Sequence, residues 1–177
     1  MLGEVIYLVD SLDRIGWVSE NWDRFASANE SPELCGSTVI GTELWSHVSD
    51  LTLRHLLQRI FAKARASRGP LFLTCRCDAP NLRRDLEVRV ESSDGASVCV
   101  TSTVTSEVPR PVTLASTSSD VFVRLCSWCN AIDVAGSWVE LETAVEKLGL
   151  LLGPHYPQIT HALCRKCEDV LRAAAKP

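Results

Sequence analysis

VIYLVDSLDRIGWVSENWDRFASAN, residues 5–29, is the stretch that decides the fold of the N-terminal part of this chain. Its first residues alternate between two faces, as in a half-buried strand. Residues 11–16 turn the chain into a second short strand at 17–19, which completes a hairpin. Asn21 can then cap a short helix that runs to Asn29.

The segment that follows predicts one long helix and then three strands. A short helical turn is expected at 44–48, and Asp50 can cap a helix whose apolar side chains recur at helical spacing. That apolar stripe consists of Leu53, Leu56, Leu57, Ile60, Phe61 and Ala64. Strand-like runs lie at 71–77, 86–91 and 96–105, and a Ser-Ser-Asp-Gly turn joins the last two. The expected order is therefore two strands, helices and three strands.

A segment rich in Pro, Ser and Thr separates this part from the C-terminal part. Residues 109–120, PRPVTLASTSSD, have no sustained period, which is typical of a linker. The sequence thus predicts a domain at 1–107, a linker at 108–120 and a second unit at 121–177. Helices are expected in that unit at 139–152, before Gly153 and Pro154, and at 164–175.

Four cysteines of the second unit form two Cys-x-x-Cys pairs, Cys126 with Cys129 and Cys164 with Cys167. This spacing lets both thiolates of a turn face one ion, and four thiolates complete a tetrahedral zinc site at roughly 2.3 Å each. His161, three residues before Cys164, is the alternative ligand, or a group that hydrogen-bonds a thiolate. The expected role of Zn²⁺ is structural, because a closed site has no position for water or substrate.

Two other kinds of chemistry remain open for the cysteine pairs, a dithiol switch and a zinc ribbon that binds nucleic acid. The residues around Cys126 lack the strand-to-helix setting of a thioredoxin motif. The formal net charge is -4, and acidic residues surround the few basic ones near the pairs, which disfavours nucleic acid as a partner. The alternative function is thus a zinc-dependent redox switch or a nucleic-acid-associated regulator. The remaining cysteines, Cys35, Cys75, Cys77 and Cys99, are expected to be packing residues.

The N-terminus, MLGEVIYLVDSLDR, has no basic region and only a short apolar run. It predicts neither a signal peptide nor a membrane span, so no membrane contact and a cytoplasmic location are expected. A reducing compartment agrees with metal ligation by thiolates. The sequence has no phosphate-binding glycine loop, no His-Glu-x-x-His and no Gly-x-Ser-x-Gly motif, and we expect no enzymatic activity.

The order of these motifs resembles a PAS sensory domain followed by a cysteine-rich tail, as in some bacterial signalling proteins. The first part runs from IYLVDSLDRIGWVSENWDRFASANE through GTELWSHVSDLTLRHLLQRIF to the three strands, roughly residues 1–107. The second part is LCSWCNAI, GSWVELETAVEKLGL and THALCRKC. The resemblance implies an α+β fold, in which a five-stranded antiparallel sheet carries helices on one face and a small zinc-binding α unit follows. It also implies signalling through a protein partner or a homodimer, and a small-molecule ligand.

Aromatic and apolar residues predict a ligand pocket between the sheet and the helices, near Trp22, Phe25, Trp45 and Leu57. The alternative is that these side chains fill a packed core. In the second unit, the large indoles of Trp128 and Trp138 are costly to expose, so this unit is expected to pack against the first domain.

Three arginines, Arg76, Arg83 and Arg84, surround a predicted hairpin connection. Guanidinium groups suit bidentate contacts with carboxylates or phosphates, which predicts a contact with an anion or a partner. The alternative is that they pair with Asp78 and Asp85 on a solvated loop.

Overall fold

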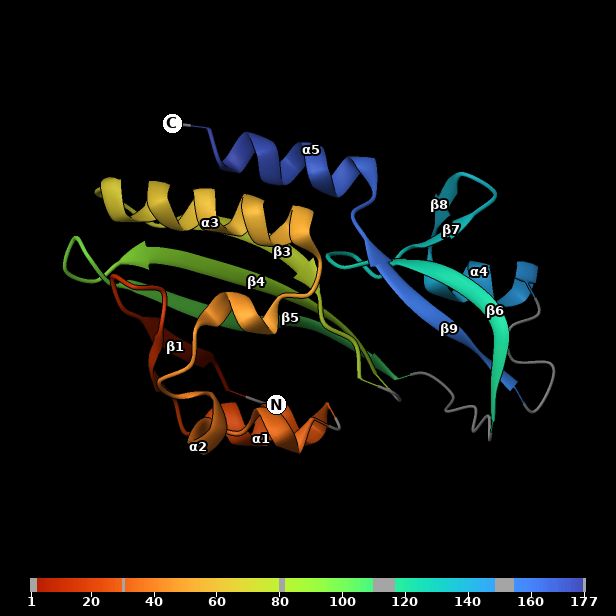
Figure 1. Cartoon of the computed structure of the whole chain (residues 1–177), viewed down its shortest axis with the longest axis horizontal. Helices are drawn as coiled ribbons and strands as arrows, with labels where there is room; N and C mark the ends of the chain where they lie inside the picture. The colour runs from red at the N-terminus through yellow and green to blue at the C-terminus, as the bar shows by residue number, and fades with distance from the viewer. Residues whose placement is uncertain (1–2, 30, 80–81, 110–116, 149–154, 177) are drawn as a thin grey trace.

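The structure, a computed structural model, describes residues 3–29, 31–79, 82–109, 117–148 and 155–176 (Figure 1). Its elements, in chain order, are β1 (Val5–Val9), β2 (Ile15–Val18), α1 (Asn21–Ala28), η1 (Pro32–Leu34), α2 (Gly36–Val39), η2 (Leu44–His47), α3 (Leu51–Ala66), β3 (Leu71–Arg76), β4 (Leu82–Ser92), β5 (Val98–Pro109), β6 (Thr117–Cys126), β7 (Ile132–Val134), β8 (Ser137–Val139), α4 (Leu141–Leu148), β9 (His155–Ala162) and α5 (Arg165–Ala174).

The first sheet is five-stranded and antiparallel, with the order β2-β1-β5-β4-β3. The N-terminal hairpin pairs with β5, so the first and last strands of this domain are neighbours inside the sheet. Helix α3 lies over β4 and β5 (Figure 1). This arrangement confirms the α+β class and the five-stranded antiparallel sheet.

Helix α3 forms as its sequence predicts. The Asp50 carboxylate accepts hydrogen bonds from the backbone N–H groups of Thr52, at 2.9 Å, and of Leu53, at 3.1 Å, which caps the first turn. Five members of the stripe are buried against the sheet: Leu53, Leu56, Ile60, Phe61 and Ala64. Helix α1 differs by one residue from the prediction, because Glu20 and not Asn21 is its N-cap.

The C-terminal unit contains a second sheet, with the order β8-β7-β6-β9, so the expectation of an α unit is wrong. Strands β6 and β9 are parallel, and the connection between them includes β7, β8 and α4. Val139, expected in a helix, pairs in β8, because Ala135 and Gly136 adopt positive φ and turn the chain into a two-residue hairpin. Residues 149–152 of the same predicted helix lie outside the described residues, as do residues 110–116 of the predicted linker. The ends of that predicted linker, 108–109 and 117–120, belong instead to β5 and β6.

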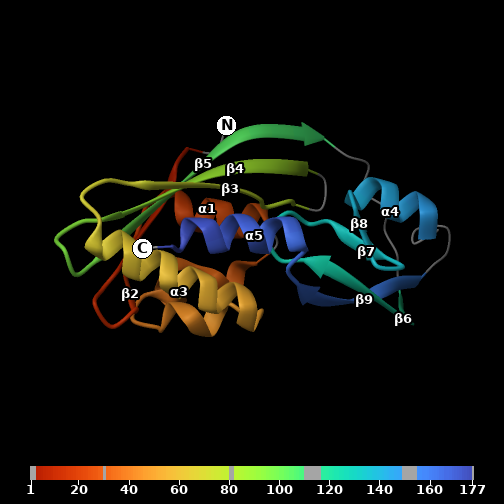
Figure 2. The same cartoon turned by 90° about the horizontal axis from the view of Figure 1, so that it is seen from above.

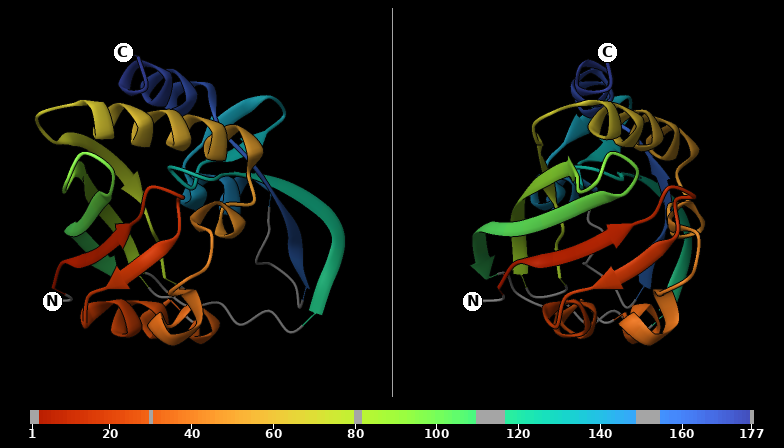
Figure 3. Two further views of the ribbon diagram at one scale, coloured as in Figure 1. Left: turned by 60° about the vertical axis from the view of Figure 1, so that its left-hand side comes forward. Right: turned by 90° about the vertical axis from the view of Figure 1, so that its left-hand side faces the viewer.

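The C-terminal helix α5 packs on α3, away from the sheet that precedes it in the chain (Figure 2). Leu171 and Ala175 belong to the same buried apolar cluster as the core of the first domain. The ammonium of Lys63 on α3 donates a 3.0 Å hydrogen bond to the carbonyl of Ala174. The views in Figure 3 show the same stacking of α5 on α3. The predicted packing of the C-terminal unit against the first domain is therefore confirmed.

Within the described residues, no helix combines the length and the apolar character that crossing a membrane requires.

Candidate functional site

The two cysteine pairs meet in space at the junction of the two units. The Sγ atoms of Cys126, Cys129, Cys164 and Cys167 all lie within 4.8 Å of one another, and three of these residues are buried. The Sγ atoms of Cys129 and Cys164 are 3.8 Å apart. A tetrahedral centre with metal–sulfur bonds of about 2.3 Å separates its sulfurs by about 3.8 Å, so the cluster has the size of a four-thiolate site.

The first pair sits on a tight turn between β6 and β7. The N–H of Cys126 donates to the carbonyl of Ala131 at 2.7 Å, and the N–H of Asn130 donates to the carbonyl of Cys126 at 3.0 Å. Asn130 has a φ of 58°, a left-handed conformation that asparagine tolerates better than most residues. The turn therefore brings both thiols of residues 126–129 to one side.

The second pair sits at the start of α5, where Cys164 is the N-cap. Backbone N–H groups point at the sulfurs: that of Cys167 donates to Cys164 Sγ at 3.5 Å, and that of Cys164 donates to Cys126 Sγ at 3.3 Å. Such donors stabilise negative charge on sulfur. The site thus fits a cation bound by thiolates.

The pKa values of these thiols depend on one another. Hydrogen bonds from Cys129, and then from Cys167, lower the pKa of Cys126. The hydrogen bond to Cys126 raises the pKa of Cys129 to about 11, and bonds to Cys126 and Cys129 raise that of Cys167. Hydrogen bonds between neighbouring thiols thus connect the cluster, and a divalent metal ion would replace the thiol protons.

The two residues between Cys126 and Cys129 attach the metal-binding turn to the first domain. The Ser127 hydroxyl donates to the Asp50 carboxylate at 2.8 Å, so one carboxylate caps α3 and holds this turn. The Trp128 indole N–H donates to the carbonyl of Thr74 on β3 at 2.7 Å, and the N–H of Arg76 donates to the carbonyl of Trp128 at 2.9 Å. These contacts were not predicted from the sequence. The Cys-x-x-Cys spacing was the available signal, because its two middle residues do not bind the metal and can contact other parts of the chain.

Replacement of Asp50 with alanine is expected to lower the free energy of unfolding by about 1–2 kcal/mol, because it removes both the α3 cap and the acceptor of Ser127. Denaturant titration measures this change. Ser127→Ala is the matched control, since it removes the Ser127–Asp50 bond and leaves the α3 cap in place. Equal losses in the two variants would show that the cap contributes nothing.

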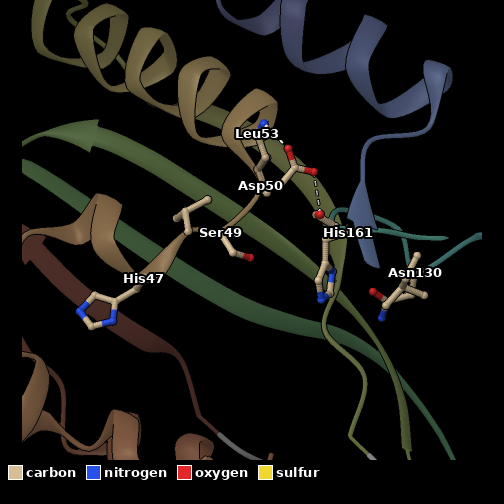
Figure 4. A pocket seen from close by; sticks show the side chains of 9 residues that line it. His47, Ser49, Asp50, Leu53, Asn130 and His161 are labelled. Atoms are coloured by element: carbon tan, nitrogen blue, oxygen red, sulfur yellow. Dashed lines mark hydrogen bonds between the residues drawn. The ribbon is translucent and has the colours of Figure 1, made fainter. Parts of the chain in front are cut away.

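His161 is on β9 and lies outside the group of converging ligand atoms. It lines an open groove of about 280 Å³ between the start of α3 and the C-terminal sheet, together with His47, Ser49 and Asn130 (Figure 4). His47 is hydrogen-bonded to Thr42 at 2.8 Å. The structure therefore places His161 beside the metal-binding turn, where it lines the groove and is not one of the converging ligands.

Two of the four residues expected to line a pocket, Trp45 and Leu57, line the same cavity, and the other two make different contacts. Trp45 and Leu57 line a cavity of about 160 Å³ between the first sheet and α3. Trp22 instead packs edge-on against Tyr7, with ring centres 5.5 Å apart, and its indole N–H donates to Leu34. Phe25 lies under the guanidinium of Arg84, with 5.6 Å from the guanidinium carbon to the ring centre.

The predicted arginine cluster contacts carboxylates of the chain itself. Arg76 has only 5% of its side chain exposed and binds Asp78 at 2.5 Å and Glu140, at the start of α4, at 2.8 Å. Arg84 is buried and binds Glu107 at 2.9 Å. Arg83 is partly exposed and lies 3.5 Å from Glu140. Arg76 on β3 and Arg83 on β4 thus connect the first sheet to the C-terminal unit.

Asp78 is the buried anion of this network. Burial opposes its ionisation, but hydrogen bonds from the Arg76 side chain and the Arg84 backbone, together with one from Asn130, hold the pKa of Asp78 below its usual value. Asn130 also forms the metal-binding turn, so the arginine network and the cysteine cluster share a residue.

No family model matches this sequence, and no curated protein matches it. Among solved structures, the chain is similar to the PAS domain of Bordetella pertussis BvgS, with 15% sequence identity and a TM-score of 0.38. That similarity covers 59% of this chain and 73% of the BvgS domain. The strand order and the helices of this chain define its α+β fold class.

Proposed function

We propose that this chain is a signal-sensing or protein-interaction module, in which a PAS-like domain is stabilised by a structural Zn²⁺ site at Cys126, Cys129, Cys164 and Cys167. One observation carries the proposal: the four thiols converge to the size of a tetrahedral site at the point where the C-terminal unit packs on the first domain. Four sulfur ligands favour zinc over the hard cations Mg²⁺ and Ca²⁺.

In this proposal the metal has no catalytic role, because four thiolates leave no coordination position for water. It links the β6–β7 turn to the start of α5, where Ala131 is buried with the cysteines and Leu163 packs against them. All eight cysteines are free thiols in the structure, which agrees with the reducing cytoplasm as the proposed location. The proposed output is a contact with a protein partner or with a second copy of the chain.

Elemental analysis of protein purified without added metal is the direct test. We expect about one zinc per chain, and we expect Cys129→Ser to lose most of it, because three thiolates no longer close the site. His161→Ala is the control and is expected to keep its zinc, since His161 lies outside the cluster. Full zinc retention in Cys129→Ser, or complete loss in His161→Ala, would contradict the four-cysteine assignment.

A further inference from the structure

The cavity between the first sheet and α3 has a composite wall. The sheet contributes Tyr7, Val88 and Ser102, helix α3 contributes Leu57, and the remaining wall includes Trp128 from the C-terminal unit. Trp128 is the residue directly before Cys129, so one side of the cavity is built by the metal-binding turn. A cavity of the first domain is thus completed only by the second unit.

The size and the polarity of this cavity indicate what it can hold. Its volume is about 160 Å³. An apolar protein cavity of about 150 Å³ is known to hold one benzene molecule. The hydroxyl groups of Tyr7 and Ser102 have no hydrogen-bond partner among the described residues. Burial raises the pKa of Tyr7 above its usual value, so its hydroxyl keeps its proton and can donate it. A single aromatic ring with one hydroxyl group matches both the apolar wall and these polar atoms.

Trp128 is held in this wall from two directions. On the side of the first domain, its indole N–H and its carbonyl are hydrogen-bonded to β3. On the other side, the flanking Cys126 and Cys129 belong to the cysteine cluster. Loss of the metal would free the turn from one of its two attachments, so the position of the indole depends on the occupancy of the metal site.

We propose that this cavity binds a single-ring aromatic molecule with one hydroxyl group, and that Trp128 makes this binding depend on the metal. The inference rests on the proposed function, since it requires zinc at the four cysteines. By linkage, a ligand that binds more tightly to the zinc-loaded protein must also strengthen zinc binding by the same factor. The chain would then bind the ligand tightly only while its four thiolates hold the metal.

The test uses phenol as the probe and calorimetric titration of the full chain, with zinc measured in every sample. We expect the zinc-loaded protein to bind phenol with a dissociation constant below about 1 mM. Binding is expected to weaken at least about tenfold when zinc is removed with a chelator, and equally in Trp128→Ala, although that variant keeps its zinc. Trp17→Ala removes an exposed tryptophan from β2 and should bind phenol normally. Val88→Phe fills the cavity and should abolish binding.

The outcomes separate this inference from the proposed function. A protein that neither carries nor takes up zinc overturns both. Zinc at one equivalent with equal phenol affinity in the loaded, stripped and Trp128→Ala proteins overturns the coupling and leaves the structural zinc intact. Failure of the zinc-loaded protein to bind phenol, or normal binding by Val88→Phe, overturns the cavity as the ligand site.

Discussion

Replacement of Cys164 with serine is expected to abolish zinc binding and to release most of the C-terminal unit from its folded state. Structural zinc contributes on the order of 10 kcal/mol of binding free energy, and that energy also counts toward folding. Serine is itself a favourable N-cap, so this variant keeps a capping acceptor at the start of α5, a hydroxyl oxygen in place of sulfur, while it removes a thiolate. The loss of stability would therefore report the metal and not the helix cap.

Amide hydrogen exchange followed by mass spectrometry resolves this effect along the chain. We expect exchange in β6, β9 and α5 to become at least about a hundredfold faster in Cys164→Ser, while β4 and β5 at the centre of the other sheet change much less. Cys99→Ser is the matched control, because Cys99 lies on β5 outside the cluster. The assignment fails if Cys164→Ser exchanges like the wild-type chain.

Replacement of Arg76 with methionine is expected to lower the free energy of unfolding by about 3–5 kcal/mol at neutral pH. The Arg76 and Asp78 side chains are only 5% and 8% exposed, so the variant leaves a buried carboxylate without its main partner. The contacts of Arg76 with Glu140 and Glu142 add little, because those carboxylates are 58% and 47% exposed. Chemical denaturation of both proteins measures the difference.

Two control variants test whether the loss of stability comes from the buried ion pair. Arg83→Met changes a more exposed arginine of the same cluster, and we expect it to cost less than about 1 kcal/mol. The double variant Arg76→Met with Asp78→Asn should recover part of the loss, because no unpaired charge stays buried. A loss in Arg76→Met no larger than that in Arg83→Met would refute the buried pair.

The same pair predicts how stability depends on pH. The pKa of Asp78 is lower in the folded protein than its usual value of 3.8, so ionised Asp78 stabilises the fold above that pH. This contribution is lost as the pH falls through the lowered pKa. The difference in stability between the wild-type chain and Arg76→Met should therefore be largest at neutral pH and shrink below about pH 4.

The sequence by itself determined the features that depend on short-range patterns. The alternation in β1, the apolar stripe of α3 and its Asp50 cap all follow from residues within a few positions of one another. The two cysteine pairs were equally visible, because a metal requires a fixed local spacing of its ligands. These patterns sufficed for the α+β class and for the cysteines that converge in the structure.

Only the tertiary structure decided how distant segments combine. The parallel pairing of β6 with β9 joins strands with several elements between them, and no local period specifies such a partner. The contact of Arg76 with Glu140 joins β3 to the acidic start of α4, more than sixty residues later in the chain. The same holds for Trp128, whose place in the cavity wall is set by β3 of the other unit. Spacing can show that Cys126 and Cys129 face an ion, but the surface that Ser127 and Trp128 contact exists only after both units have folded and packed.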